Sequence, residues 1–298
     1  MSNSVLCLET MPDQATFYRK YWNKIPFVVR NAIKVGGLIE ADELAGLSLE
    51  EDIRSRIVTK GAGSTDWKCE HGPFKEDKFS QLGEEGWSLL VQDVEKHHPP
   101  MQQILKPFGF SPCWLIDDVM VSYSVPGGGV GPHLDSYHVF LIQGQGKRRW
   151  KLGREAIKNE EYIQDIDLKI LKDEFEGDTF DVEEGDLIYI PPLFAHAGDT
   201  IKESLTFSIG FLGPSLSELL VEFGHYIEEQ ATMNHRYDAN ELDASSAGED
   251  MSNGELANFR GTLTDAIHSD HFEVWLKNYF SKPDDDFSVV SDFALRRP

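Results

Sequence analysis

Three residues of the chain have the types and spacing of a metal site. His133-Leu134-Asp135 forms an H-x-D motif, and His196 follows about 60 residues later. Alternate side chains of a strand share one face, so a strand here would place His133 beside Asp135, and a nearby strand would supply His196. Two imidazoles and one carboxylate on one face of an octahedron leave three positions open, the donor set of non-haem Fe(II) oxygenases.

The surroundings of these residues strengthen a weak motif, because H-x-D occurs by chance in many chains. The run VPGGGVGPHLD leads into the first two candidates, and GDLIYIPPLFAH ends at the third. Glycine and proline at both sites predict sharp turns at the rim of a barrel. The alternative is that three unrelated polar residues happen to have this spacing.

A second candidate site residue is Arg148, in the run Lys147-Arg148-Arg149-Trp150-Lys151-Leu152. Strand alternation groups Arg148 with the apolar residues of the run and predicts that it points inward. A buried guanidinium is costly unless it meets an anion with good geometry, and the carboxylate of a dicarboxylate co-substrate would provide one. An internal salt bridge to a protein carboxylate is the alternative.

The segment 115–125 alternates in the same informative way. One of its faces is entirely apolar and predicts packing against a dry core. The other face is too polar for a sealed core and suits a ligand cavity. This polar face carries Asp118, Met120, Ser122 and Ser124. Tyr137, by its parity with His133 and Asp135, and Ser208, on the segment 204–212, are expected to face the same cavity.

The elements that must position these residues are short strands separated by turns. Between Trp114 and Leu212 a turn signal recurs about every ten residues, which favours a sandwich or barrel. The expected strands are 115–125, 133–143, 147–152, 178–183, 186–191 and 204–212. The expected turns are 127–129, 144–146 and 183–185.

The segments before the barrel read differently. Residues 15–33 predict a helix followed by a short extended piece, 36–60 predict an acidic helix, and 61–86 predict a connection rich in glycine and charge. A buried strand is expected over 87–94, and a helix after Pro99-Pro100.

Helical periodicity returns after Gly213-Pro214. Ser215 and Glu218 have the spacing of a capping box, and an apolar stripe follows over 216–227. A second amphipathic helix is expected over 272–280, with a polar loop at 238–254 between the two. The tail, 282–298, is expected to be poorly ordered.

Composition excludes several classes of protein. The 298 residues are 40% hydrophobic, which is enough for a large core, and no apolar run approaches the ~20 residues of a membrane span. Residues 1–14 have neither the basic nor the apolar region of a secretory signal. The three cysteines are few and widely spaced, so neither disulfides nor a zinc cluster is expected. We therefore expect a cytoplasmic protein.

The net charge is the most informative feature of the composition. The chain carries 51 acidic against 28 basic residues, a net charge of −23. Such a surface repels phosphate, so neither direct nucleic-acid binding nor membrane binding is expected. It would attract a basic protein, although acidity that serves only solubility or a salty cytoplasm explains the same numbers.

The residues described above also carry a family resemblance, densest from Leu115 to Leu212 in the runs SYSVPGGGVGPHLDSYHVFLIQGQGKRRW and GDLIYIPPLFAHAG. From about residue 15 to 280 the chain resembles the JmjC-type 2-oxoglutarate/Fe(II) oxygenases of the cupin superfamily. It is most similar to the bacterial ribosomal oxygenases that hydroxylate an arginine of a large-subunit ribosomal protein.

This resemblance implies a fold, cofactors and partners. The fold would be mostly β with α flanks, a double-stranded β-helix barrel followed by a helical dimerisation region. Fe(II) would bind His133, Asp135 and His196, while Arg148 would bind 2-oxoglutarate as co-substrate, with Ser122 in the same pocket. The implied partners are a basic ribosomal protein and a second copy of the chain.

An arginine substrate would give Asp118 a role. A carboxylate that lines an oxygenase cavity without ligating the metal needs a cation. With Arg148 committed to 2-oxoglutarate, Asp118 would grip the substrate guanidinium while Tyr137 packs on its plane, with Met120 and Ser208 as further contacts. The alternative is that Asp118 or Asp117 caps a turn where the strand begins.

The domain boundaries expected from these patterns are a helical or mixed flank over 1–86, the barrel over 87–213, the helical dimerisation region over 214–281 and the tail over 282–298. The chain is thus expected to be a 2-oxoglutarate-dependent protein arginine hydroxylase. A histidine or asparagine hydroxylase, a lysine demethylase and a non-catalytic cupin binding module are the rival functions.

Overall fold

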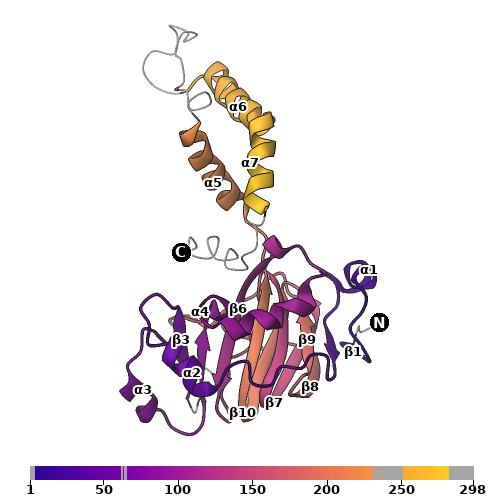
Figure 1. The fold of residues 1–298 in the computed structure, drawn as a ribbon, viewed down its shortest axis with the longest axis vertical. Helices are drawn as coiled ribbons and strands as arrows, with labels where there is room; N and C mark the ends of the chain where they lie inside the picture. The colour runs from indigo at the N-terminus through magenta and orange to yellow at the C-terminus, as the bar shows by residue number, and fades with distance from the viewer. Residues whose placement is uncertain (1–3, 62, 64–65, 231–235, 237–250, 282–298) are drawn as a thin grey trace. The chain divides into compact units, whose positions relative to one another are not determined.

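A computed structural model describes the chain except for residues 1–3, 62, 64–65, 231–235, 237–250 and 282–298. The chain divides into two compact units between Leu212 and Gly213. The first unit is built on one large sheet and the second is helical (Figure 1). No described helix has both the length and the apolar character needed to cross a bilayer.

Ten strands form the sheet of the first unit, and every neighbouring pair is antiparallel except β1 with β2. The order across it is β1 (Leu6–Leu8), β2 (Phe27–Val29), β9 (Leu187–Ile190), β7 (His138–Ala156), β10 (Phe194–Phe211), β6 (Ile116–Ser124), β5 (Trp87–Val91), β3 (Ser55–Lys60) and β4 (Trp67–His71), with β8 (Gly177–Glu183) on β7. The long strands β7 and β10 pair along most of their lengths and form the spine of the sheet.

Short helices flank this sheet. They are α1 (Gln14–Thr16), the π-helical turn η1 (Phe17–Tyr21), α2 (Ala41–Leu47), α3 (Glu76–Gln81), α4 (Val94–His97) and the 3₁₀ segments η2 (Pro99–Phe108) and η3 (Cys113–Leu115). Helix α2 packs against β5 and β6, and α4 packs against β6. Phe17, Phe108, Phe140 and Tyr189 are fully buried between these flanks and the sheet, in the largest core cluster.

The two faces of β6 differ as the alternation predicts. Val119 and Val121 are completely buried in that core, while Met120 and Ser122 face the opposite side, where a cavity lies. One side of the sheet is therefore dry and the other is available to a ligand.

The predicted elements were wrong in several places. The expected helix over 36–60 ends early, and Ser55–Lys60 form β3, because Ile57 and Val58 are buried between β4 and β5. The expected connection over 61–86 contains β4 and α3. The expected strand from 133 begins only at His138.

A further difference concerns the expected turn at 144–146. The chain does not reverse there, because these residues lie inside β7 where it passes close to β10. Gly146 has a φ of +74°, and a Cβ atom on it would overlap the carbonyl oxygen of Glu203. The glycines therefore permit a close strand contact instead of a reversal.

The second unit contains α5 (Leu216–Glu229), α6 (Asn253–Ile267) and α7 (Asp270–Phe280). The predicted capping box is confirmed, since the Ser215 hydroxyl accepts from the Glu218 amide and the Glu218 carboxylate accepts from the Ser215 amide. Helix α6 was not predicted, although Ser252 and Glu255 form a capping box with the same spacing. Most of the expected loop at 238–254 and the whole expected tail lie outside the described residues.

Candidate metal centre

A cavity of about 610 Å³ opens on the polar face of the sheet. Its walls come from β3, β5, β6, β7 and β10, together with the segment 166–169. The side chains of His133, Asp135 and His196 all line it.

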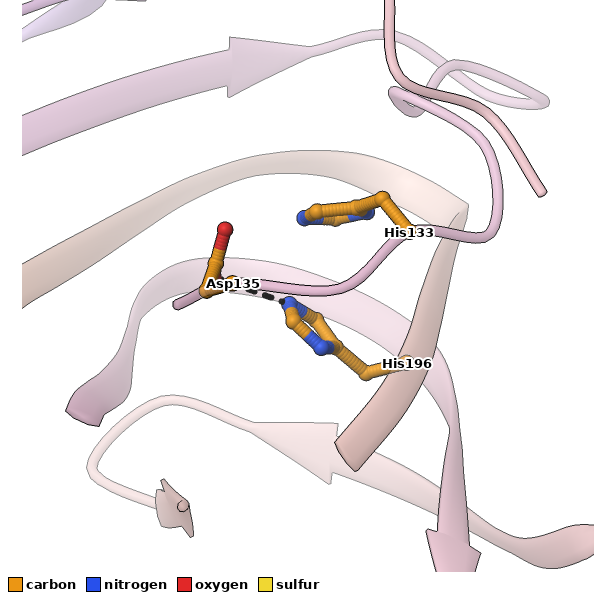
Figure 2. Close-up of side chains that lie close together, drawn as sticks. All are labelled: His133, Asp135 and His196. Carbon is orange, nitrogen blue, oxygen red and sulfur yellow. Dashed lines mark ion pairs between the residues drawn. The ribbon is translucent and has the colours of Figure 1, made fainter. Parts of the chain in front are cut away.

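These three side chains converge, as Figure 2 shows. One ligand atom from each lies within 4.8 Å of the other two, and Nε2 of His196 is 3.4 Å from a carboxylate oxygen of Asp135. His196 is on β10, whereas His133 and Asp135 lie in the loop before β7, so the expected strand does not place them. Two backbone hydrogen bonds of 3.0 Å between His133 and His196 bring the loop and the strand together instead.

The outer nitrogens of both imidazoles are already bonded. Nδ1 of His133 donates to the carbonyl oxygen of Gly131 at 2.9 Å, and Nδ1 of His196 donates to that of Phe194 at 3.0 Å. A carbonyl oxygen only accepts, so each Nδ1 carries the proton and each Nε2 keeps a free lone pair. This second layer of hydrogen bonds is the usual support of metal-bound histidines.

The protonation states also fit a metal. Burial and the neighbouring His196 lower the pKa of His133 to about 4. Burial works against ionisation of Asp135, but the neighbouring side chains of His196, His133 and Arg56 hold its pKa below the usual value. Neutral imidazole and ionised carboxylate, the forms that coordinate metals, are therefore favoured at neutral pH.

Arg148 points into the same cavity, as the alternation predicts, and is only 3% exposed. Its guanidinium donates to Ser122 Oγ (3.4 Å), Thr206 Oγ1 (3.3 Å) and the Gly198 carbonyl oxygen (3.0 Å), while its Nε has no partner. No described carboxylate forms an ion pair with it, so the internal salt bridge is absent from the described part of the chain. Burial without such a partner lowers its pKa to about 10.

Of the four residues expected to contact the substrate, three line the cavity: Met120, Tyr137 and Ser208. Asp118 does not, which corrects the prediction that it is part of the wall. Its carboxylate and the ring of Tyr137, which does line the cavity, both lie near Gly210. Burial, followed by the nearby charges of Asp117, Asp93 and Glu95, raises its pKa to about 8.

Sequence reasoning missed two parts of the wall. Arg56 lines the cavity from β3, a segment expected to be helical, and the segment 166–169 covers it from a region with no assigned element. The β-branched run Ile57-Val58-Thr59 was the available signal for a strand there.

Comparisons with known proteins agree with this geometry. Residues 103–219 match the JmjC domain family. The chain is 36% identical over 277 residues to the Escherichia coli ribosomal protein uL16 3-hydroxylase, covering 92% of this chain and 73% of that protein. It is 39% identical over 222 residues to a probable ribosomal oxygenase of Haemophilus influenzae, covering 74% of this chain and 54% of that protein.

Solved structures extend the likeness to the fold. The X-ray structure of E. coli YcfD superposes with a TM-score of 0.78 at 34% identity, over 93% of this chain and 73% of that one. The complex of the same E. coli ribosomal oxygenase with cobalt and 2-oxoglutarate gives a TM-score of 0.76 at 35% identity, with the same coverage. These matches confirm the predicted JmjC/cupin barrel with C-terminal helices.

The expected cofactors, a metal ion and 2-oxoglutarate, are those found with this fold, and the His-Asp-His group offers suitable metal ligands. The family follows from two of these matches. The E. coli hydroxylase is 36% identical and is covered over 73% of its length, and the E. coli structure has the same fold. The chain belongs to the JmjC-domain ribosomal oxygenases, which are 2-oxoglutarate-dependent dioxygenases.

Proposed function

We propose that this protein is an Fe(II)- and 2-oxoglutarate-dependent oxygenase that hydroxylates an arginine side chain of a large-subunit ribosomal protein. The observation that carries the proposal is the pairing, in one cavity, of a His-Asp-His group with a buried arginine that no described carboxylate neutralises.

The metal ligands in this proposal are His133, Asp135 and His196. The imidazoles of His133 and His196 are oriented by hydrogen bonds to backbone carbonyl oxygens. The main chain of Asp135 is held by a hydrogen bond from the Leu193 amide, so little reorganisation is needed when a metal enters. Bound Fe(II) and 2-oxoglutarate would supply the chemistry that inserts an oxygen atom from dioxygen into a substrate C–H bond.

Arg148 binds the far carboxylate of 2-oxoglutarate. Ser122 and Thr206 hold one end of its guanidinium and Gly198 holds the other, so its direction is fixed before the co-substrate arrives. A carboxylate would neutralise a cation that burial otherwise destabilises, which is a strong reason for binding.

Asp118 and Tyr137 recognise the substrate arginine. No described cation forms an ion pair with Asp118, and its raised pKa indicates a carboxyl group that lacks a compensating charge. A guanidinium at Gly210 could meet the Asp118 carboxylate and the Tyr137 ring together, with Met120 and Ser208 lining the approach. A net charge of −23 would draw a basic ribosomal protein toward this site.

Turnover of 2-oxoglutarate tests the activity. The purified protein with Fe(II) and ascorbate should convert 2-oxoglutarate to succinate faster when large-subunit ribosomal proteins are added, and Asp135→Ala should abolish this turnover while keeping the parent circular dichroism spectrum. Near-normal turnover by Asp135→Ala would show that the metal ligands are wrongly assigned. Loss of methyl groups from lysine would favour the demethylase, and binding without turnover the non-catalytic module.

A further inference from the structure

The cavity contains a second guanidinium whose role the proposed function leaves open. Arg56 is half-buried on β3 and lines the same cavity as the His-Asp-His group. Its side chain forms no hydrogen bond or ion pair with any residue in the described part of the chain. An arginine with five unused donors facing a cavity points to an acceptor that arrives with a ligand.

The strand register fixes the position in the sheet from which the Arg56 side chain extends. Arg56 pairs with Leu90, Leu90 pairs with Ser122, and Ser122 pairs with Thr206, so the four residues form one row across the sheet. Arg148 contacts the Ser122–Thr206 end of this row. Two strand spacings, roughly 10 Å, separate Arg56 from that end, so the two arginines serve different ligand groups.

The carboxylates of the cavity are already engaged. Of the described lining residues, only Asp135 and Asp167 carry one. Asp135 faces His196, and Asp167 forms an ion pair of 2.6 Å with His71, the residue opposite Arg56 on β4. An internal partner for Arg56 is therefore missing among the residues that line the cavity.

We propose that Arg56 anchors the substrate chain by donating hydrogen bonds to a main-chain carbonyl oxygen close to the hydroxylated arginine. This inference rests on the proposed function. The row of Arg56 crosses β6 at Ser122. Asp118 lies four residues from Ser122 along the same strand, about 13 Å away. A substrate arginine that reaches Asp118 would therefore leave its neighbouring residues near the row of Arg56.

The acceptor is assigned to the main chain because of charge. The proposed substrate, a ribosomal protein, is basic, and its cationic side chains would be repelled by Arg56. Carbonyl oxygens are present at every residue of any peptide, and an arginine fork binds them without regard to side-chain identity. Arg56 would thus orient the chain while Asp118 selects the side chain.

Peptide binding, measured by fluorescence anisotropy, tests this assignment without relying on turnover. The probe is an amidated ribosomal-protein peptide that carries the target arginine and has Asn and Gln in place of Asp and Glu. Arg56→Met should raise its Kd about ten- to a hundredfold, while Arg56→Lys should recover part of the loss. Lys60→Met, an exposed position on the same strand, is the control and should bind as the parent does.

Three further readouts separate the explanations. The Tm of Arg56→Met should match that of the parent, and its Kd for 2-oxoglutarate should change less than twofold. A parallel rise in the Kd for 2-oxoglutarate, or an unchanged Kd for the peptide, would overturn the assignment. A weakening seen only with the natural acidic residues present would also overturn it, because the acceptor would then be a side chain. If the parent binds the peptide without hydroxylating any arginine, the proposed function fails while the effect of Arg56 on binding still stands.

Discussion

At the scale of single residues, Arg148 is a buried cation with no carboxylate partner among the described residues. Its guanidinium donates to three uncharged acceptors, two hydroxyl oxygens and one carbonyl oxygen, and its Nε has no partner. Burial lowers its pKa to about 10. A site that holds an uncompensated cation costs stability in the free protein and gains it back when an anion binds.

Arg148→Met should therefore weaken 2-oxoglutarate binding and stabilise the free protein. Loss of the charged contact is expected to cost about 2–4 kcal/mol, a rise of roughly 30- to 1000-fold in the KM for 2-oxoglutarate. The Tm without ligand should rise, because a buried charge is removed. Arg149→Met is the matched control, since Arg149 is exposed and paired with Asp181. An unchanged KM in Arg148→Met would direct the search to another cation.

The pH dependence of stability is expected to come from Asp118. Its pKa is about 8 in the folded protein, against an ordinary value of 3.8, because of burial and neighbouring carboxylates. The unfolded chain loses this proton near pH 4 and the folded chain keeps it to about pH 8, so stability falls as pH rises through that window. Asp118→Asn removes the penalty and should gain Tm over the parent progressively from pH 4 to 8.

The same variant should lose arginine hydroxylation, because an amide cannot neutralise a guanidinium. Higher stability with lower activity is the expected signature of a binding residue. Asp181→Asn, at a partly exposed carboxylate whose pKa is lowered by Arg149, should show no such gain. Parallel Tm profiles for Asp118→Asn and the parent would contradict the assignment of an uncompensated carboxyl group.

At the scale of elements, the close contact between β7 and β10 positions the site. Gly146 lies in β7 with a φ of +74°, and Gly144 lies against the Phe207 ring. Gly146→Ala should destabilise the protein by more than about 1 kcal/mol, because an alanine is strained there and its Cβ would meet the backbone of β10. Urea denaturation measures this loss, and Gly83→Ala, exposed with open space around it, is the control. Equal stability of the two variants would show that β7 and β10 do not approach closely.

Alternation predicted the elements whose two faces differ. The polar and apolar faces of β6 and the inward direction of Arg148 followed directly, since one face of each strand meets the core. The convergence of His133 and Asp135 was predicted for a wrong reason. A loop held by two backbone hydrogen bonds to His196 places them, and no local pattern encodes that pairing. Strand β3, and with it Arg56, was missed because its short run gains its burial only from β4 and β5.

At the scale of the whole molecule, the helical unit leaves part of its apolar surface open. Only part of the predicted apolar stripe on α5 is buried. Phe223 packs against Phe272 and Trp275. Leu216 and Leu220 are 73% and 51% exposed. Exposed apolar residues also follow α6, at Leu256, Phe259, Leu263 and Ile267. We propose that a second copy of the chain covers the exposed apolar residues of α5 and α6, because exposed apolar stripes on helices mark interfaces.

Leu220→Asp tests the dimer. The charge would be buried without a partner in the interface, so the variant should sediment as a monomer where the parent sediments as a dimer. His225→Asp, at an exposed position of the same helix, controls for added charge alone. A Leu220→Asp protein that stays dimeric would remove this part of α5 from the interface.

The central claim, hydroxylation of an arginine in a large-subunit ribosomal protein, is tested most directly by mass spectrometry of ribosomal proteins from cells with and without the gene. We predict that one large-subunit protein from cells with the gene is heavier by one oxygen atom, that fragmentation places the oxygen on an arginine, and that Asp135→Ala abolishes the modification. Ribosomal proteins of identical mass in both cells, or an oxygen placed on histidine or asparagine, would contradict the account.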